Sequence, residues 1–150
     1  MFLEKELQKL EALFVHAKKH NSKVSEKDVG WHIDHSLKSL IAISNALEQS
    51  NPAEYRWSFN IARFFVYTAG SIPRGRGKAP EAVQSFGLIA EEALKAHLED
   101  AKNKLKALYK LPAGSYFNHP YFGMLNVKQT RRFMIIHTRH HLKIIWDIMR

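Results

Sequence analysis

The chain has 150 residues, of which 45% are hydrophobic and 25% are charged, and it contains no cysteine. This length and composition are typical of one soluble globular domain, so we expect residues 1–150 to form a single domain. The lack of cysteine excludes disulfides, thiolate metal sites and a cysteine nucleophile, and it agrees with a cytoplasmic location. The formal net charge of +9 is typical of a basic, soluble surface, and it also raises the odds of an anionic partner.

The sequence predicts neither a membrane protein nor a nucleic-acid-binding protein. The N-terminal stretch carries charges throughout, so it lacks the apolar centre of a signal peptide. No run approaches the roughly 18 apolar residues of a spanning helix. The basic residues are scattered and form no known reader motif, so a nucleic-acid partner is not expected. A small anionic molecule is the partner that the charge favours, and a homodimer stays open.

Apolar residues recur at helical spacing in four long segments. The first predicted helix spans residues 2–19. Ser25 is the predicted N-cap of the second, with Asp28 in the capping-box region, and this helix extends to about residue 49. The third spans about residues 86–110.

A capping box begins the fourth predicted helix, where Asn126 is followed at the third helical position by Gln129. This helix extends to about residue 149. Between the second and third long helices, Asn51 and Pro52 start a short helical element that continues through an aromatic-rich stretch, in which an extended piece stays open.

Two loops interrupt the helical pattern. Residues 70–80 contain three glycines, two prolines and three cations, and residues 117–123 form the second loop. No segment shows convincing strand alternation. The prediction is therefore an all-α fold: an antiparallel or cross-connected four-helix bundle with a short extra helical element between the second and third long helices.

Two histidines stand in the apolar stripe of the last predicted helix. His137 and His141 share a face with Met134 and Ile145, while cations such as Arg139 lie on the other side. The two histidines are one helical turn apart, which is the geometry that two imidazoles need to reach one metal ion. A buried pair without partners would be costly, so metal binding competes with a purely structural role.

A third ligand would come from another helix, and periodicity does not decide between His32 and His35. His35 shares its face with small residues, which would let a neighbouring helix approach closely. However, the most apolar stripe of that helix points elsewhere. His140 is at the edge of the core face and is a candidate for orienting a ligand. His119 precedes a proline in a loop and is a candidate for lining a pocket.

Several motifs together resemble the DinB-like superfamily over about residues 29–148. They are a Trp-x-x-x-His segment, the loop His-Pro-Tyr-Phe-Gly, a His-x-x-x-His helix, Ile-Pro-Arg-Gly and Ala-Pro, at positions 31–35, 119–123, 137–141, 72–75 and 79–80. The nearest likeness is to a branch described as a domain of unknown function. The resemblance implies a four-helix bundle that holds a divalent metal through His35, His137 and His141.

The resemblance implies fold and site more than reaction. Relatives include thiol S-transferases that use bacillithiol or mycothiol, and a thiol-dependent maleylpyruvate isomerase. A three-histidine site suits zinc, nickel or iron and leaves positions open for substrate. Cations of the first loop, Arg74, Arg76 and Lys78, could receive a carboxylate-bearing thiol, although a solvated turn explains them equally.

Three functions remain open from the sequence. The first is a metal-dependent transferase or hydrolase acting on a small molecule. The second is a binding or stress-response module that retains a metal without turnover. The third is a metal-free bundle that acts through its surface.

Overall fold

The computed structural model describes residues 1–75 and 79–150, which are mostly helical. Their helices and strands, in chain order, are α1 (Glu4–Ala12), α2 (Val29–Gln49), α3 (Ile61–Ala69), α4 (Glu91–Ala107), β1 (Tyr116–His119), β2 (Gly123–Asn126) and α5 (Val127–Met149). Single 3₁₀ turns follow α1, α2 and α4 and precede residue 84.

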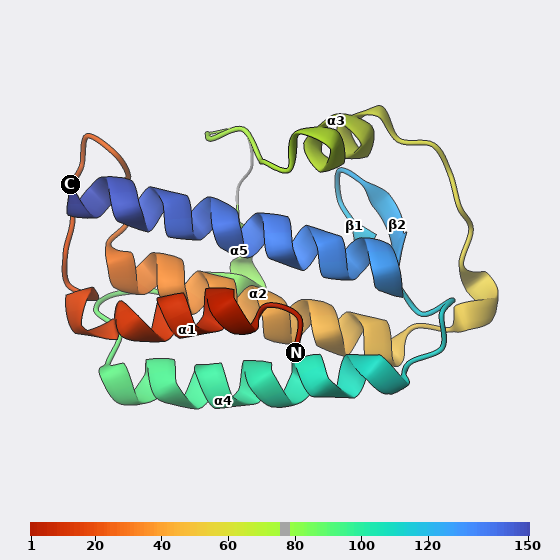
Figure 1. Cartoon of the computed structure of the whole chain (residues 1–150), viewed down its shortest axis with the longest axis horizontal. Coiled ribbons are helices and arrows are strands. Elements are labelled where there is room, and N and C mark those ends of the chain that lie inside the picture. The colour runs from red at the N-terminus through yellow and green to blue at the C-terminus, as the bar shows by residue number, and fades with distance from the viewer. Residues whose placement is uncertain (76–78) are drawn as a thin grey trace.

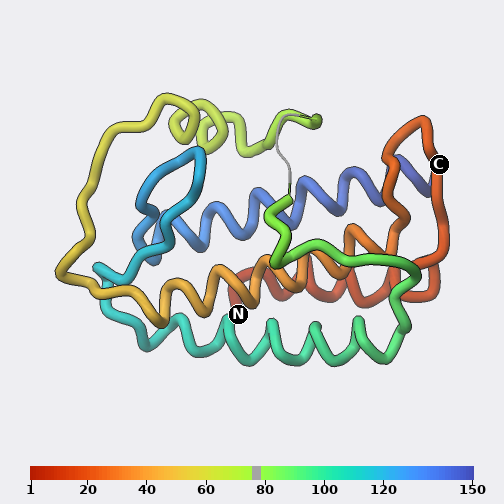
Figure 2. The backbone as a smooth tube through the Cα atoms, turned by 180° about the vertical axis from the view of Figure 1, so that it is seen from behind, coloured from red at the N-terminus to blue at the C-terminus, as the bar shows by residue number. Residues whose placement is uncertain are grey.

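Four helices form a bundle in which α2 lies between α4 and α5, and α1 contacts α4 and α5 (Figure 1). The colours in Figure 1 show that α1 and α5 run in one direction and that α2 and α4 run in the opposite direction. The bundle is therefore cross-connected: the chain between α2 and α4 returns to the starting end, as the tube in Figure 2 shows. The short helix α3 and the hairpin β1–β2 lie together over the beginning of α5.

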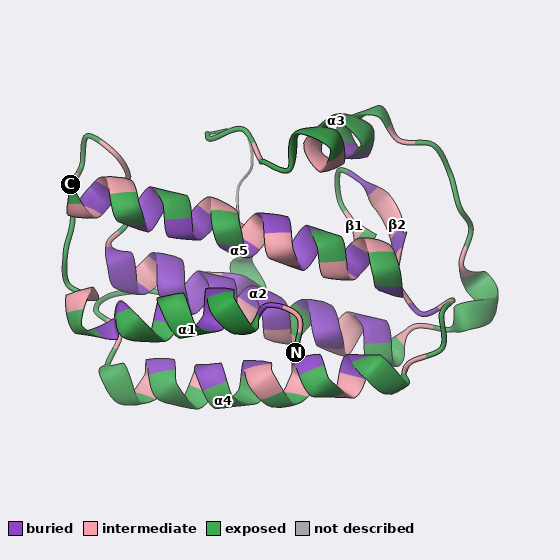
Figure 3. Cartoon of the chain, viewed as in Figure 1, coloured by how far each residue is buried: buried purple, intermediate pink, exposed green. Residues whose placement is uncertain are grey.

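Buried residues recur along all four of these helices, between exposed ones (Figure 3). Its largest fully buried side chains are mostly leucines contributed by each of them: Leu7 and Leu10, Ile33, Leu37, Leu40 and Leu47, Leu94, Leu98 and Leu105, and Met134. Burying such side chains is the main favourable contribution to folding. Because α2 is buried along most of its length, polar side chains on it that face α4 or α5 are removed from water.

The N-cap of the helix that carries His32 and His35 lies three residues later than the predicted cap, Ser25. Asp28 is the N-cap of α2, and its carboxylate accepts from the backbone N–H of Trp31 at 2.7 Å. The N–H groups of the first two helical residues, Val29 and Gly30, donate to the carbonyls of Lys19 and Ala17 at 3.0 and 2.8 Å. First-turn N–H groups have no partner within their own helix, so these carbonyls satisfy them.

The same contacts correct the predicted length of the first helix. The chain leaves α1 at Ala12 and folds over the start of α2, so the helix predicted over residues 2–19 has only 9 residues in α-conformation. A Cβ at Gly30 would lie 3.1 Å from the Ala17 carbonyl oxygen, which is a tight contact, so this crossing favours glycine. The fold thus has three long helices and one short one in its bundle.

The all-α prediction also needs correction, because the second predicted loop is partly a β-hairpin. Strands β1 and β2 pair antiparallel, with Phe117 opposite Leu125 and His119 opposite Gly123. These strands are only four residues long, which gives a periodicity of two no room to show. The capping box of α5 is confirmed: Asn126 accepts from the Gln129 N–H, and Gln129 accepts from the Asn126 N–H.

The short element between α2 and α4 is present as α3, preceded by an extended stretch. Arg76 and Lys78 of the predicted cationic loop lie outside the described residues. Arg74 is described and forms an ion pair with Asp147 at 2.6 Å. Among the described residues, none of the helices is both long and apolar enough to cross a membrane.

Candidate metal centre

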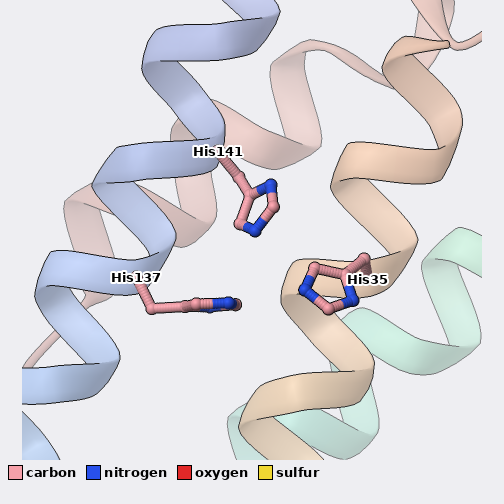
Figure 4. Close-up of side chains that lie close together, drawn as sticks. All are labelled: His35, His137 and His141. Carbon is pink, nitrogen blue, oxygen red and sulfur yellow. The ribbon is translucent and has the colours of Figure 1, made fainter. Parts of the chain in front are cut away.

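Helices α2 and α5 bring three histidines together at their interface. His35, His137 and His141 each offer one ring nitrogen, and these nitrogens all lie within 4.8 Å of one another. Figure 4 shows the imidazoles of His137 and His141 pointing from α5, and that of His35 pointing from α2, toward a common space. His35 and His141 are buried, and His137 is half-buried.

A backbone hydrogen bond selects the protonation of His35. Its Nδ1 lies 3.0 Å from the carbonyl oxygen of Val83, which can only accept, so Nδ1 carries the proton. The other ring nitrogen, Nε2, then has its lone pair free. Metal-binding histidines typically donate their second ring N–H in this way, which fixes the ring and increases its basicity. The indole of Trp31 stacks on this imidazole, with centroids 4.8 Å apart.

His141 has a histidine as its hydrogen-bond partner. The Nδ1 atoms of His141 and His32 lie 3.0 Å apart, and Nε2 of His32 lies 2.9 Å from the Oγ of Ser25. His32 is 4% exposed, so both hydrogen bonds are shielded from water at its ring. The structure therefore places His32 beside His141 and not within the group of three converging nitrogens.

His137 has a buried nitrogen without a hydrogen-bond partner among the described residues, namely Nδ1. The indole Nε1 of Trp31, which stacks on His35, is in the same condition. Buried polar atoms are normally paired, so an unpartnered His137 nitrogen within a group of converging imidazoles is compatible with a role as a metal ligand. Each neutral imidazole has one ring nitrogen with a lone pair, and three such groups close together fit a divalent ion such as zinc.

Burial keeps this cluster neutral. It lowers the pKa of His137 and His141 well below the ordinary value of 6.5, with the neighbouring histidines adding to the effect. Burial also lowers the pKa of His35, against the hydrogen bond to Val83, and lowers that of His32 to about 3. Neutral imidazole is the form that binds metal, so the cluster needs no deprotonation at neutral pH.

A second polar network lies on the α4 side of α2. Asp34, 1% exposed, accepts from His97 at 2.6 Å, from Lys38 at 2.8 Å and from Ser85 through a short hydrogen bond. Burial raises the pKa of Asp34, but the hydrogen bonds from Lys38, Ser85 and His97 outweigh it and lower the pKa overall. Asp34 is thus committed to holding the segment that carries Val83.

Two further histidines surround the cluster. His140 contacts the edge of the His141 ring at 5.2 Å between centroids. Burial and then the charge of Arg74 lower the pKa of His140. His119 accepts through Nδ1 from the N–H groups of Tyr121 and Phe122, both at 3.1 Å, so its first role is to hold the hairpin turn.

Two surface cavities of the described chain lie away from the three converging histidines. One, of about 360 Å³, is lined by aromatic residues and two arginines, including Trp57, Phe64, Tyr67 and Arg63. The other, of about 590 Å³, lies between the end of α1 and the start of α4. Neither cavity contains His35, His137 or His141 in its lining.

Sequence reasoning brought the three histidines together but missed the groups that orient them. The Val83 carbonyl gives no side-chain signal, because every residue has one. The sequence indicated Ser25 only as a helix cap and gave no sign of its hydrogen bond with His32.

Comparison with known proteins yields one family. No curated protein and no solved structure matches the chain. A family described as "Protein of unknown function (DUF1569)" matches residues 61–147, which include α3, the hairpin, α4 and both histidines of α5. Since the match covers more than half of the sequence, the chain belongs to this family of proteins of unknown function.

Proposed function

We propose that the chain is a DinB-like protein that binds one divalent metal ion through His35, His137 and His141 and acts as a metal-dependent transferase or hydrolase on a small molecule. The observation that supports it is the convergence of three ring nitrogens within 4.8 Å. Nitrogens bound to one zinc ion at 2.0–2.1 Å lie about 3.4 Å apart. Small rotations of the three side chains would bring them to that spacing.

A divalent ion held by three histidines keeps positions open for water or substrate, and it would lower the pKa of a bound water or thiol. The protein residues supply the rest. The Val83 carbonyl holds His35 by its Nδ1 proton. The ring of Trp31, stacked on His35, covers the cluster on one side and restricts access of water there.

The substrate class that we propose is a small anionic thiol. The chain has no cysteine, so a thiol would come from outside. The charge of Arg74 contributes to lowering the pKa of His140, and the formal net charge of the chain is +9. Because Arg74 pairs with Asp147, a carboxylate of the substrate would compete with that side chain for the guanidinium.

The first experiment measures metal in protein purified without an affinity tag. The wild type should retain about one divalent ion per chain, and His35→Ala, His137→Ala and His141→Ala should each lose it. His20→Ala is the matched control, because His20 is exposed and is not one of the converging histidines. Full metal retention by His137→Ala would contradict the assignment.

The second experiment separates catalysis from storage. The metal-loaded protein is incubated with a small thiol and an electrophile, and the loss of free thiol is followed. Transfer that stops when the metal is removed supports the transferase. Tight metal binding without turnover would indicate a metal-retaining binding or stress-response module.

A further inference from the structure

The hydrogen-bonded chain Ser25–His32–His141 leads from a half-buried turn to the candidate metal centre. Its two links are the 2.9 Å contact of Ser25 Oγ with His32 Nε2 and the 3.0 Å contact of His32 Nδ1 with His141 Nδ1. Two imidazole nitrogens at this distance must share one proton, because one has to donate and the other accept. These two hydrogen bonds can therefore be arranged in two ways: either both donate in the direction from His141 to Ser25, or both donate in the opposite direction.

Only one arrangement is compatible with metal at His141. If Nε2 of His141 binds the ion, its Nδ1 carries the proton and donates to His32 Nδ1. His32 then carries its proton on Nε2 and donates to Ser25 Oγ. In the opposite arrangement Ser25 donates to His32, His32 donates to His141, and the His141 proton sits on Nε2, where it blocks the metal.

The surroundings of Ser25 are compatible with the metal-compatible direction. Its Oγ accepts from the backbone N–H of Lys27 at 3.0 Å, so this oxygen is already placed as an acceptor. A serine oxygen has two lone pairs and can accept from both Lys27 and His32. The backbone of Ser25 is itself held by its N–H, which donates to the Asn21 carbonyl at 3.0 Å.

We propose that His32 is a positioning residue: it accepts the Nδ1 proton of His141, and thereby presents Nε2 of His141 to the metal, while Ser25 completes the chain. This inference rests on the proposed metal site. His32 then does for His141 what the Val83 carbonyl does for His35. The two partners differ in one respect. A carbonyl oxygen can only accept a hydrogen bond, whereas Nδ1 of His32 can accept or donate, depending on its tautomer. Metal binding should therefore fix the proton arrangement of His32, a residue that does not bind the ion.

Two isosteric variants test the hydrogen bond separately from packing. In His32→Asn, the amide oxygen takes approximately the place of Nδ1 and can accept from His141. In His32→Leu, the side chain has nearly the shape of asparagine but cannot accept a hydrogen bond. Orienting partners of metal ligands typically contribute 10- to 100-fold in metal affinity. We expect Zn²⁺ and Co²⁺ to bind His32→Leu 10- to 100-fold more weakly than the wild type, and His32→Asn within about threefold of it.

A control and a direct readout accompany the titration. His20→Leu removes an exposed imidazole that is not part of the cluster, and it should bind Co²⁺ like the wild type. Proton–nitrogen NMR spectra of the imidazoles distinguish the two tautomers. In the zinc-loaded wild type, His141 should carry its proton on Nδ1 and His32 on Nε2.

Each outcome decides the matter. Equal Co²⁺ affinity of His32→Leu and the wild type would overturn the role of His32 and leave the metal site standing. Equal weakening of the Asn and Leu variants would also overturn it, because the acceptor would then be irrelevant. A wild type that binds neither Zn²⁺ nor Co²⁺ would overturn the metal site, and this inference with it.

Discussion

The Nδ1 atom of His35 lies 3.0 Å from the carbonyl oxygen of Val83, which comes 48 residues later in the chain. The carbonyl belongs to a short 3₁₀ turn, Glu81–Val83, whose position depends on the residues that follow it. Ser85 ties this segment to α2, because its Oγ donates to Asp34 and accepts from Lys38 at 3.0 Å. We therefore expect the orientation of His35 to depend on Ser85, which is not one of the three converging residues.

The first prediction tests that dependence with Ser85→Ala. The variant loses both hydrogen bonds and leaves the Val83 carbonyl less firmly held, so Zn²⁺ should bind about three- to tenfold more weakly, at the low end for an orienting partner. The free energy of unfolding should fall by about 1 kcal/mol. Calorimetric titration and urea unfolding measure the two effects. Ser71→Ala, at an exposed position, is the control, and an unchanged zinc affinity in Ser85→Ala would separate the serine from the site.

The second prediction concerns the stability of the metal-free protein in acid. Folding lowers the pKa of His32 to about 3 and of His119 to about 4, and it lowers those of His35, His137 and His141 as well, chiefly through burial. Below the ordinary value of about 6.5, the unfolded chain binds protons that the folded chain does not, so stability decreases as pH falls. The slope is about 1.4 kcal/mol per pH unit for each histidine that stays neutral.

Urea unfolding of the metal-free protein at pH 7.5, 6.5, 5.5 and 4.5 checks this slope. The decline should begin near pH 6.5 and continue toward pH 4, and it should be smaller in His137→Phe, which removes one of the contributing groups. A free energy of unfolding that does not change between pH 7.5 and 5 would contradict the lowered pKa values.

The third prediction separates His119 from the metal. Its Nδ1 accepts from two backbone N–H groups of the hairpin turn, and its ring stacks on Phe122 with centroids 4.2 Å apart. His119→Ala should therefore reduce stability by about 2 kcal/mol, or roughly 4–8 °C in Tm, with the metal content unchanged. His119→Asn, whose oxygen can replace Nδ1 as acceptor, should recover part of the loss. Thermal unfolding and elemental analysis measure the two quantities, and loss of metal in His119→Ala would assign this residue to the site instead.

The fourth prediction concerns the anionic substrate. Arg74→Ala removes the cation near His140, so the metal-loaded protein should bind glutathione several-fold more weakly while its metal content stays the same. Binding of the uncharged 2-mercaptoethanol should not change, because it lacks a carboxylate. Arg150→Ala is the matched control, since Arg150 also pairs with Asp147 but at 3.5 Å and at an exposed position. Equal effects on both thiols would indicate that Arg74 acts on the structure and not on the charge of the ligand.

The helical pattern predicted α5 well, because one face of this helix is buried, whereas α4 begins at Glu91, five residues later than predicted. It failed at residues 13–19, because the apolar spacing there continues while the chain turns to satisfy the first N–H groups of α2. It also failed at the hairpin, whose strands are too short to show a period. In both places contacts distant in sequence decide the local structure, and no local pattern records them.

The candidate site shows the same division. The pair His137 and His141 followed from helical spacing alone, because both residues belong to one helix. Choosing between His32 and His35 required the rotation of α2 against α5, which periodicity left open. The structure turns His35 toward the α5 pair and gives His32 a hydrogen bond to His141. Two histidines three positions apart therefore face the same cluster with different contacts.

The placement of the converging histidines on α2 and α5 also bears on the order of events during folding. His35 is near the start of α2, whereas His137 and His141 lie on the helix that is synthesised after all the others described. The three nitrogens can meet only after α5 has packed against α2, which requires contacts between segments far apart in sequence, and such contacts form slowly. Metal uptake would then mark the docking of α5, and an ion added early in refolding would find only isolated imidazoles.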